Sequence, residues 1–162
     1  MSQSAQALWD EYLASGSSDA SLAAGAPYAS WEFGDSPELA DRLLGLVITG
    51  PKRATCGSLD AYRVRGEAVP VVGEYSVVCD GAGTARCVLQ TTEVRILAFE
   101  DVDATFAADE GEGDRSLASW REDHMAYFER ELAELELSAS PRMLLVCERF
   151  RLLYVATLAT ST

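Results

Sequence analysis

The segment from Gly50 to Thr55, with the sequence Gly-Pro-Lys-Arg-Ala-Thr, carries the residues best suited to chemistry in this chain. Lys52 is the only lysine of the sequence, and a lysine that folding removes from water has a lowered pKa and can act as a general base. The hydroxyl of Thr55 can serve as a nucleophile or hold a water molecule. Two simpler interpretations stay open: Lys52 is a solvated residue behind a helix end, and Thr55 is an ordinary strand residue.

A third chemical group comes from the acidic stretch between residues 100 and 114, which contains no basic residue. A carboxylate there, such as Glu110, can position water or protonate a leaving amine. Gly111 and Gly113 allow tight turns, which suit a loop that lines a pocket. The alternatives are a solvated acidic loop with a helix start and a divalent-cation site, although the spacing does not match an EF-hand loop. The acidic residues are Glu100, Asp101, Asp103, Asp109, Glu110, Glu112 and Asp114.

Aromatic and cationic side chains elsewhere are candidates for holding a ligand. Trp31 and Phe33 can stack on a nucleobase or belong to the core. His124, the only histidine, follows Trp120 by four residues on the apolar side of a predicted helix, where a hydrogen-bonded core or rim position is more common than catalysis. Arg149 beside Glu148 is either a pocket ion pair or an ordinary strand pair. The predicted ligand-binding residues are Trp31, Phe33, Arg53, Glu112, Arg115, Trp120 and His124.

The overall charge restricts the class of ligand. The 162 residues include 26 acidic and 13 basic ones, which gives a formal net charge of −13, and no cluster of Lys and Arg stands out. Because a protein that grips a long phosphate backbone needs a basic stripe, extended duplex DNA is disfavoured as a partner. The expected partner is a small nucleoside-like molecule or a short RNA held in a local positive patch. The sequence does not predict the oligomeric state.

Length and composition predict one globular domain. Hydrophobic residues make up 48% of the chain and charged residues 24%, and no apolar run approaches the roughly 20 residues that cross a bilayer. The N-terminus lacks the basic and apolar regions of a secretory signal, so we expect a cytoplasmic protein with reduced thiols and no membrane partner. The cysteines form no CxxC pair and have no histidine nearby, which disfavours a zinc site, and neither a metal nor a cofactor is expected. They are Cys56, Cys79, Cys87 and Cys147.

Hydrophobic periodicity and turn signals predict the elements that must position these groups. The segment Asp35-Ser36-Pro37-Glu38 is a strong helix start, and apolar residues then recur at helical spacing as far as Gly50. This mixture of helices and strands without βαβ alternation predicts an α+β fold with a small, mostly antiparallel barrel. The other predicted elements are a helix over 4–14, a loop over 15–27, a strand or turn over 54–59, a helical turn over 60–65, strands over 74–79 and 84–98 joined by a hairpin turn at 80–83, a long amphipathic helix over 116–135 and a final strand over 143–155.

Two stretches of the sequence resemble bacterial ASCH-domain proteins. They are WEFGDSPELADRLLGLVITGPKRAT, at residues 31–55, and FAADEGEGDRSLASW, at residues 106–120. The pattern Gly-x-Lys-x-x-Thr alone is weak, because many proteins match it by chance. A capped helix before it and the pattern EGEGD-x-SL-x-x-W well after it make the combination specific. The resemblance runs from about Trp31 to Tyr154. We therefore expect an N-terminal extension over 1–27, an ASCH domain over 28–156 and a C-terminal tail over 157–162.

The resemblance implies a PUA-like β-barrel with flanking helices, a fold associated with RNA and modified nucleosides. Some ASCH members are amidohydrolases that act on N4-acylated cytidines, and others are ribonucleases. In the amidohydrolases a lysine, a threonine three residues later and a distant glutamate form the site. The resemblance thus implies catalytic roles for Lys52, Thr55 and Glu110, with Glu112 as the rival of Glu110. The residues that depart from the usual motif are Pro51, Arg53 and Cys56.

The leading hypothesis is a domain that binds a nucleoside-sized ligand and hydrolyses amides of the N4-acylated cytidine type. The same three groups could also hold a base edge without breaking a bond. The first alternative is an RNA-binding module or ribonuclease, in which Lys52 acts on phosphates together with Arg53, Arg63 or Arg65. The second alternative is an interaction module without catalysis.

Overall fold

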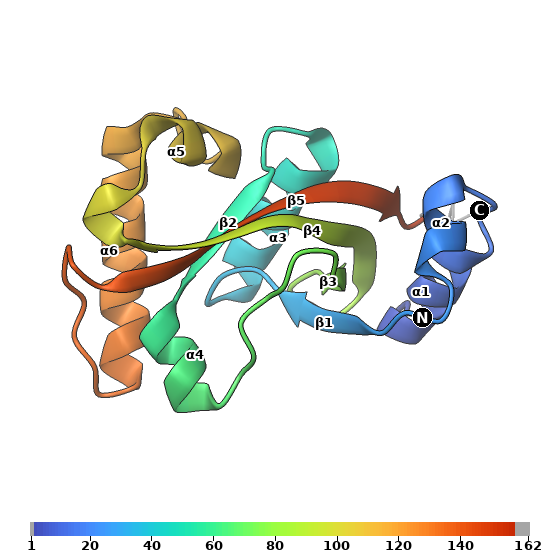
Figure 1. Ribbon diagram of the computed structural model, residues 1–162, viewed down its shortest axis with the longest axis horizontal. Coiled ribbons are helices and arrows are strands. Elements are labelled where there is room, and N and C mark those ends of the chain that lie inside the picture. Colours follow the sequence, from blue (N-terminus) through green and yellow to red (C-terminus); the bar gives the residue numbers. More distant parts are fainter. Residues whose placement is uncertain (1, 158–162) are drawn as a thin grey trace. The chain divides into compact units, whose positions relative to one another are not determined.

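The computed structural model describes residues 2–157, which group into two compact units. Unit 1 is formed by residues 2–49, 73–90 and 151–157, and unit 2 by residues 50–72 and 91–150. Two long strands, β4 (Ala85–Ala98) and β5 (Leu144–Val155), contribute residues to both units (Figure 1). Within the described part of the chain, every helix is too short or too polar to span a bilayer.

Unit 1 contains the N-terminal helices, one long helix and four neighbouring strands. The strand order is β1-β3-β4-β5, with β1 parallel to β3 and β3 antiparallel to β4. The predicted helices over 4–14 and after Pro37 are confirmed, as is the hairpin whose turn lies at 80–83. Besides parts of β4 and β5, the elements of unit 1 are α1 (Ala5–Leu13), α2 (Ser18–Ala23), β1 (Tyr28–Glu32), α3 (Pro37–Thr49) and β3 (Tyr75–Cys79).

Two elements of unit 1 differ from the sequence prediction. The loop predicted over 15–27 contains helix α2, which begins where the hydroxyl of Ser17 accepts a hydrogen bond from the N–H of Ala20 at 3.1 Å. A serine in this position satisfies one of the N–H groups left free at a helix start. Strand β1 was not predicted, because its five residues offer only a short alternation of apolar and polar side chains. It forms by pairing with β3, which follows it by more than 40 residues.

Unit 2 contains strand β2, three α-helices and the remaining parts of β4 and β5. The strand order is β4-β5-β2, and β2 pairs antiparallel with β5. Of the strand or turn predicted over 54–59, the structure forms a strand, and the helical turn after it and the long helix over 116–135 are confirmed. The acidic stretch contains an additional helix, α5, capped by Asp103. The elements of unit 2 are β2 (Ala54–Ser58), α4 (Leu59–Arg65), the short 3₁₀ helix η1 (Phe99–Asp101), α5 (Ala104–Glu110) and α6 (Leu117–Glu134).

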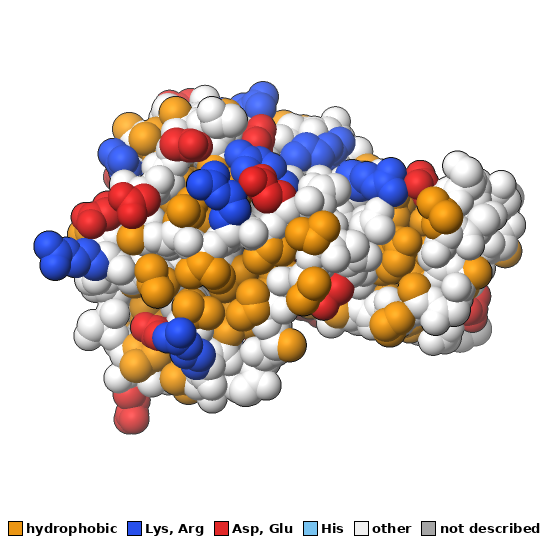
Figure 2. Space-filling model, in the orientation of Figure 1, with side chains coloured by type: hydrophobic (Ala, Val, Ile, Leu, Met, Phe, Trp, Pro, Cys, Tyr) orange, Lys and Arg blue, Asp and Glu red, His pale blue; other side chains and the backbone are white. Residues whose placement is uncertain are grey.

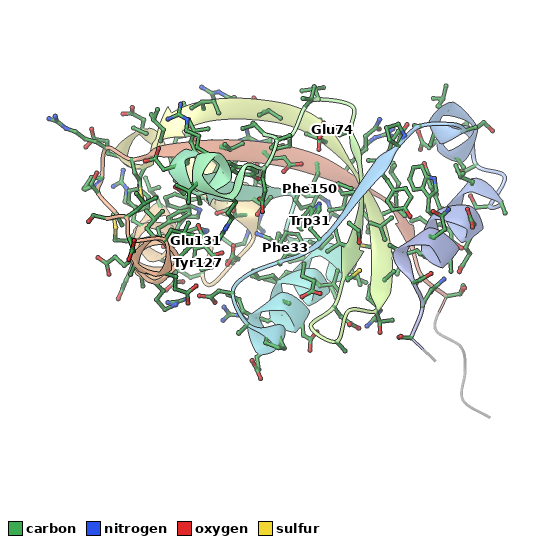
Figure 3. The ribbon with its side chains drawn as sticks, turned by 90° about the horizontal axis from the view of Figure 1, so that it is seen from below. Trp31, Phe33, Glu74, Tyr127, Glu131 and Phe150 are labelled. Atoms are coloured by element: carbon green, nitrogen blue, oxygen red, sulfur yellow. The ribbon has the colours of Figure 1, made fainter. Side chains whose placement is uncertain are left out.

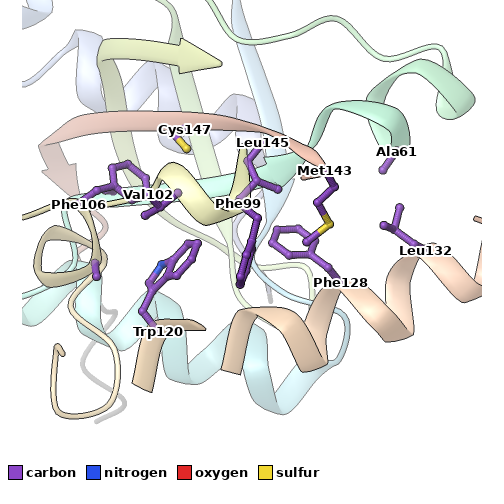
Figure 4. Packing of buried hydrophobic residues seen from close by; sticks show 12 residues of the cluster. Ala61, Phe99, Val102, Phe106, Trp120, Phe128, Leu132, Met143, Leu145 and Cys147 are labelled. Atoms are coloured by element: carbon purple, nitrogen blue, oxygen red, sulfur yellow. The ribbon is translucent and has the colours of Figure 1, made fainter. Parts of the chain in front are cut away.

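Each unit has its own hydrophobic cluster. In unit 1, the cluster joins α1 and α2 to buried residues of β3 and β4, and Trp9 and Tyr12 are its largest members. In unit 2, side chains from η1, α5, α6 and β5 pack together (Figure 4). Phe128 of α6 lies at the centre of this second cluster and is fully buried. Because an apolar stripe of α6 is buried here, the packing fixes the position of the polar side chains on the same helix.

One carboxylate in unit 1 binds residues from both ends of the described part of the chain. The side chain of Glu11 on α1 accepts hydrogen bonds from Gln3 at 2.6 Å, from Tyr154 at 2.8 Å and from Thr157 at 2.6 Å. These bonds favour the ionised form. The hydrogen bonds from Thr157, Tyr154 and Gln3 lower the pKa of Glu11 from 4.5 to about 2.

We predict that Glu11→Gln lowers the melting temperature at about pH 7, and that this difference from wild type vanishes near pH 2. A carboxyl group whose pKa is lower in the folded state stabilises the protein above its unfolded pKa. The contribution is lost as the pH falls through the folded pKa. Thermal unfolding of both proteins across this pH range measures the effect. The control variant Glu74→Gln removes an exposed carboxylate of the same unit, and an equal pH dependence in both variants would contradict the prediction.

Candidate active site

The Lys52 segment is held against the end of α5 by direct contact between backbones in unit 2. The N–H of Arg53 donates to the carbonyl oxygen of Asp109 at 2.7 Å. Gly111, with φ of 69°, follows α5, and a Cβ atom there would lie 2.4 Å from the carbonyl oxygen of Pro51. Only glycine permits both this φ and this close approach. The contact places Lys52 beside Glu110, although 57 residues separate them in the sequence.

Lys52 is buried and surrounded by acceptors. Its side chain is 1% exposed, and its ammonium nitrogen Nζ donates to Glu112 Oε2 at 2.9 Å and to the carbonyl oxygen of Glu110 at 3.3 Å. The Nζ atom also lies 3.8 Å from Glu110 Oε1. Both carboxylates that the sequence left as rivals therefore contact the same lysine. In this geometry Lys52 acts as a hydrogen-bond donor to both glutamates.

Two side chains of α6 complete the cluster around Glu110. Trp120 and His124 stand one helical turn apart, and their rings stack with centroids 4.3 Å apart. The indole nitrogen Nε1 of Trp120 donates to Glu110 Oε2. The imidazole Nε2 of His124 lies 2.7 Å from the same oxygen and 3.7 Å from Glu112 Oε2. The two α6 side chains thus hold one oxygen of Glu110, while Lys52 faces the other.

The hydrogen bonds assign the protons of this cluster. His124 Nδ1 lies 2.9 Å from the carbonyl oxygen of Trp120, which can only accept, so Nδ1 carries a proton. The contact of Nε2 with Glu110 also needs a proton, which makes an imidazolium facing a carboxylate the simplest state. Lys52 and His124 then balance Glu110 and Glu112. We name these four residues the ion cluster.

The pKa directions agree with this assignment. Burial alone raises the pKa of Glu110, but the charges of Lys52 and His124 and the hydrogen bonds from His124 and Trp120 outweigh it and leave the pKa lowered. Burial alone lowers the pKa of His124, but the charge and hydrogen bond of Glu110 outweigh it and leave the pKa raised. Each partner therefore favours the charged form of the other.

Comparison with known proteins gives the family. The ASCH domain family matches residues 29–154. The chain belongs to the ASCH domain family. An ASCH domain structure from Lactobacillus crispatus JV V101 superposes with a TM-score of 0.84 at 35% sequence identity, covering 93% of this chain and 94% of that one. A protein from Enterococcus faecalis V583, described with the family DUF984, gives 0.82 at 35% identity, covering 93% and 88%. No curated protein matches significantly.

These matches confirm the predicted family and the α+β, PUA-like fold of this ASCH domain chain. The five strands form a mixed sheet. Among the strand pairings described, β1 with β3 is parallel and the others are antiparallel. The roles that the resemblance implies for individual residues stay predictions.

Thr55 occupies the other face of strand β2 from the ion cluster. Successive residues of a strand point to opposite faces, and the neighbouring Cys56 points to Glu110, with its Sγ 3.9 Å from Oε2. Thr55 lies opposite Glu148 in the β2–β5 register. Glu148 is buried and accepts a hydrogen bond from Thr91 at 2.5 Å. The structure of this ASCH domain chain thus brings Lys52 to Glu110 but turns Thr55 toward a second polar group.

The remaining predicted ligand-binding residues lie in different surroundings. Trp31 and Phe33 belong to unit 1, where their rings meet edge to face with centroids 4.8 Å apart (Figure 3). Trp31 is half-buried and Phe33 is buried. In unit 2, the side chain of Arg53 donates to the carbonyl oxygen of Lys52 at 2.9 Å. Arg115 is exposed and donates to the carbonyl oxygen of Ala108 at 3.1 Å.

Arg63 and Arg65, two of the three arginines considered for phosphate binding, contact acidic residues of unit 2. Arg63 lies 3.4 Å from Asp60, and Arg65 lies 3.4 Å from Glu131, which also accepts from the hydroxyl of the neighbouring Tyr127 (Figure 3). On the face drawn in Figure 2, basic side chains stand beside acidic ones. Arg149 follows the same pattern, at 2.9 Å from Asp109 and 2.5 Å from Glu93. Arg63, Arg65 and Arg149 would therefore bind phosphate only in competition with these carboxylates.

Sequence reasoning missed one residue of the site, Cys56. It appeared only as an unusual neighbour of the motif, yet its thiol contacts Glu110 and is close to His124. The alternation of β2 contains the signal, because Ala54 and Cys56 share the face that packs into the core of unit 2.

The acidic residues between 100 and 114 differ in how exposed their side chains are. Glu110 is buried and Glu112 half-buried, whereas Glu100, Asp101, Asp103 and Asp114 are exposed.

Proposed function

We propose that this ASCH domain protein binds a nucleoside-sized ligand at the ion cluster and hydrolyses an amide bond in it. The observation that supports this proposal is one charge-balanced group of four ionisable side chains, in which Lys52 and Glu110 are buried and Glu112 and His124 are half-buried. Taking such groups out of water is costly, and apolar residues of similar volume often stabilise a core better. Ionisable groups held in this way are more common at functional sites than elsewhere.

The geometry favours Glu112 as the residue that meets the reacting atoms. Its side chain is 19% exposed, compared with 1% for Glu110. Glu112 would accept a proton from a water molecule that attacks the amide carbonyl, and would return it to the leaving nitrogen, so that one water yields a carboxylic acid and an amine. Lys52 would act as a positioning residue, because it donates to the reacting carboxylate at 2.9 Å. Glu110 would hold Lys52 and His124 in place.

The role of Thr55 separates two versions of this reaction. If Thr55 is the nucleophile, as the family resemblance implies, an acyl group passes through its hydroxyl before water releases it. The strand alternation that turns Thr55 away from Glu110 supports direct attack by water. Thr55→Val retains the shape of the side chain and removes the hydroxyl. Hydrolysis that survives in this variant supports direct attack.

Hydrolysis of N4-acetylcytidine to cytidine and acetate tests the proposal. We expect turnover by the wild type, and a loss of about 100-fold or more in kcat/KM for Glu112→Gln. The matched control is Glu131→Gln, which removes a carboxylate of unit 2 that is 11% exposed and paired with Arg65; it should retain activity. Absence of turnover by the wild type, or equal rates for Glu112→Gln and wild type, would contradict the proposal. Cleavage of short single-stranded RNA by the wild type would favour the ribonuclease alternative instead.

A further inference from the structure

Three side chains that suit a transition metal meet in the core of unit 2. They are the thiol of Cys56 on β2, the carboxylate of Glu110 at the end of α5 and the imidazole of His124 on α6. One ligand atom from each lies within 4.8 Å of the others. Sulfur, nitrogen and oxygen together are the ligands of zinc and related borderline cations, and three protein ligands with one open position are common at zinc sites.

Neighbouring groups form hydrogen bonds with His124 and Glu110. Such bonds usually orient the ligands of a metal ion. The Nδ1 atom of His124 bonds to the carbonyl oxygen of Trp120, which leaves Nε2 directed at Glu110. The indole of Trp120 donates to Glu110 Oε2. A hydrogen bond from the second ring nitrogen to a backbone carbonyl, and a hydrogen-bonded carboxylate, are typical of the shell behind metal ligands.

Lys52 does not compete for the same oxygen. Its ammonium faces Glu110 Oε1, at 3.8 Å, whereas Cys56 and His124 face Oε2. A cation bound to Oε2 and the ammonium would therefore use different oxygens of one carboxylate. Glu112 contacts both Lys52 and His124, with its Oε2 at 2.9 Å from Lys52 Nζ and 3.7 Å from His124 Nε2. Its negative charge would help to balance a metal ion bound beside the ammonium of Lys52.

We propose that Cys56, Glu110 and His124 form a binding site for a divalent cation of the zinc type. The cation takes the place of the proton between His124 Nε2 and Glu110 Oε2. It also displaces the proton of the Cys56 thiol, because a cysteine binds zinc as the thiolate. One M²⁺ thus replaces two H⁺, and the net charge of the group is unchanged. This inference is independent of the proposed amide hydrolysis, because it concerns binding alone.

Titration of the chelator-treated full chain with Co²⁺ tests the site. We expect one equivalent to bind with the near-ultraviolet charge-transfer absorption of a cobalt–thiolate bond. Cys56→Ser should lose this absorption, and His124→Asn should weaken binding by at least about 10-fold, the effect expected even for a residue behind the ligands. The matched control Cys87→Ser removes a buried thiol of unit 1 and should behave as wild type. A wild type without this absorption, or absorption that persists in Cys56→Ser, would overturn the proposal.

A second measurement uses the wild type alone, so it does not depend on whether a variant folds. X-ray absorption of the zinc-loaded protein should give one sulfur at about 2.3 Å, with the remaining ligands nitrogen or oxygen at about 2.0–2.2 Å. A zinc shell without sulfur would overturn the assignment of Cys56. If the wild type binds Co²⁺ but does not hydrolyse N4-acetylcytidine, the proposed reaction is rejected and the metal site is still supported.

Discussion

Replacing Lys52 with methionine should lower the free energy of unfolding by about 3–5 kcal/mol, the cost expected when one partner of a buried ion pair is removed. The methionine fills most of the volume of the lysine, but it leaves Glu110 and Glu112 without the ammonium that both contact. Glu110 is 1% exposed, so water cannot replace that partner. Urea denaturation of the two proteins measures the difference.

An exposed ion pair provides the control for this experiment. Arg63→Met also replaces a cation with methionine, but Arg63 is 66% exposed and pairs with a 57% exposed Asp60. Its loss should change the free energy of unfolding by less than about 1 kcal/mol. The double variant Lys52→Met with Glu110→Gln should recover part of the stability lost in the single variant, because it removes one of the two carboxylate charges that Lys52 no longer balances. A change below about 1 kcal/mol for Lys52→Met would show that the ion cluster does not stabilise unit 2.

Phe128→Ala should have an effect of similar size, about 3–5 kcal/mol, for a different reason. Phe128 is fully buried and packs with Phe99, Leu132 and Met143 in the core of unit 2 (Figure 4). Removing its ring takes apolar surface from the core and leaves a cavity that the surrounding side chains fill only in part. Urea denaturation again measures the loss.

The same variant tests how the core supports the site. Phe128 follows His124 by four residues on α6, with ring centroids 6.3 Å apart, so a loosened α6 should also loosen the ion cluster. Amide hydrogen exchange along α6 should therefore be faster in Phe128→Ala. Val64→Ala, at a position of α4 that is 57% exposed, should change stability by less than about 0.5 kcal/mol. Equal stability losses in the two variants would contradict the assignment of Phe128 to the core.

Several elements were predictable because their signals are local. The cap at Ser36, the proline that follows it and the apolar spacing up to Val47 all lie within a few turns of helix α3. The hairpin turn at 80–83 and the long amphipathic helix α6 likewise need no information from distant residues. Helix α2 carried a local signal too, the cap at Ser17, but the Gly, Ser and Ala content around it favoured a loop. Strand β1 is only five residues long and pairs with the remote strand β3, so its local signal was too short to predict a strand.

The sequence by itself determined the family, the types of element and the residues able to do chemistry, since these depend on residue identity and short-range spacing. Only the tertiary structure decided that Lys52 is buried, that both Glu110 and Glu112 contact it, and that Cys56 and His124 meet at Glu110. These residues come from β2, α5 and α6, and their distances follow from how the core of unit 2 packs. Their protonation depends in turn on those distances and on the exclusion of water, neither of which a linear pattern contains.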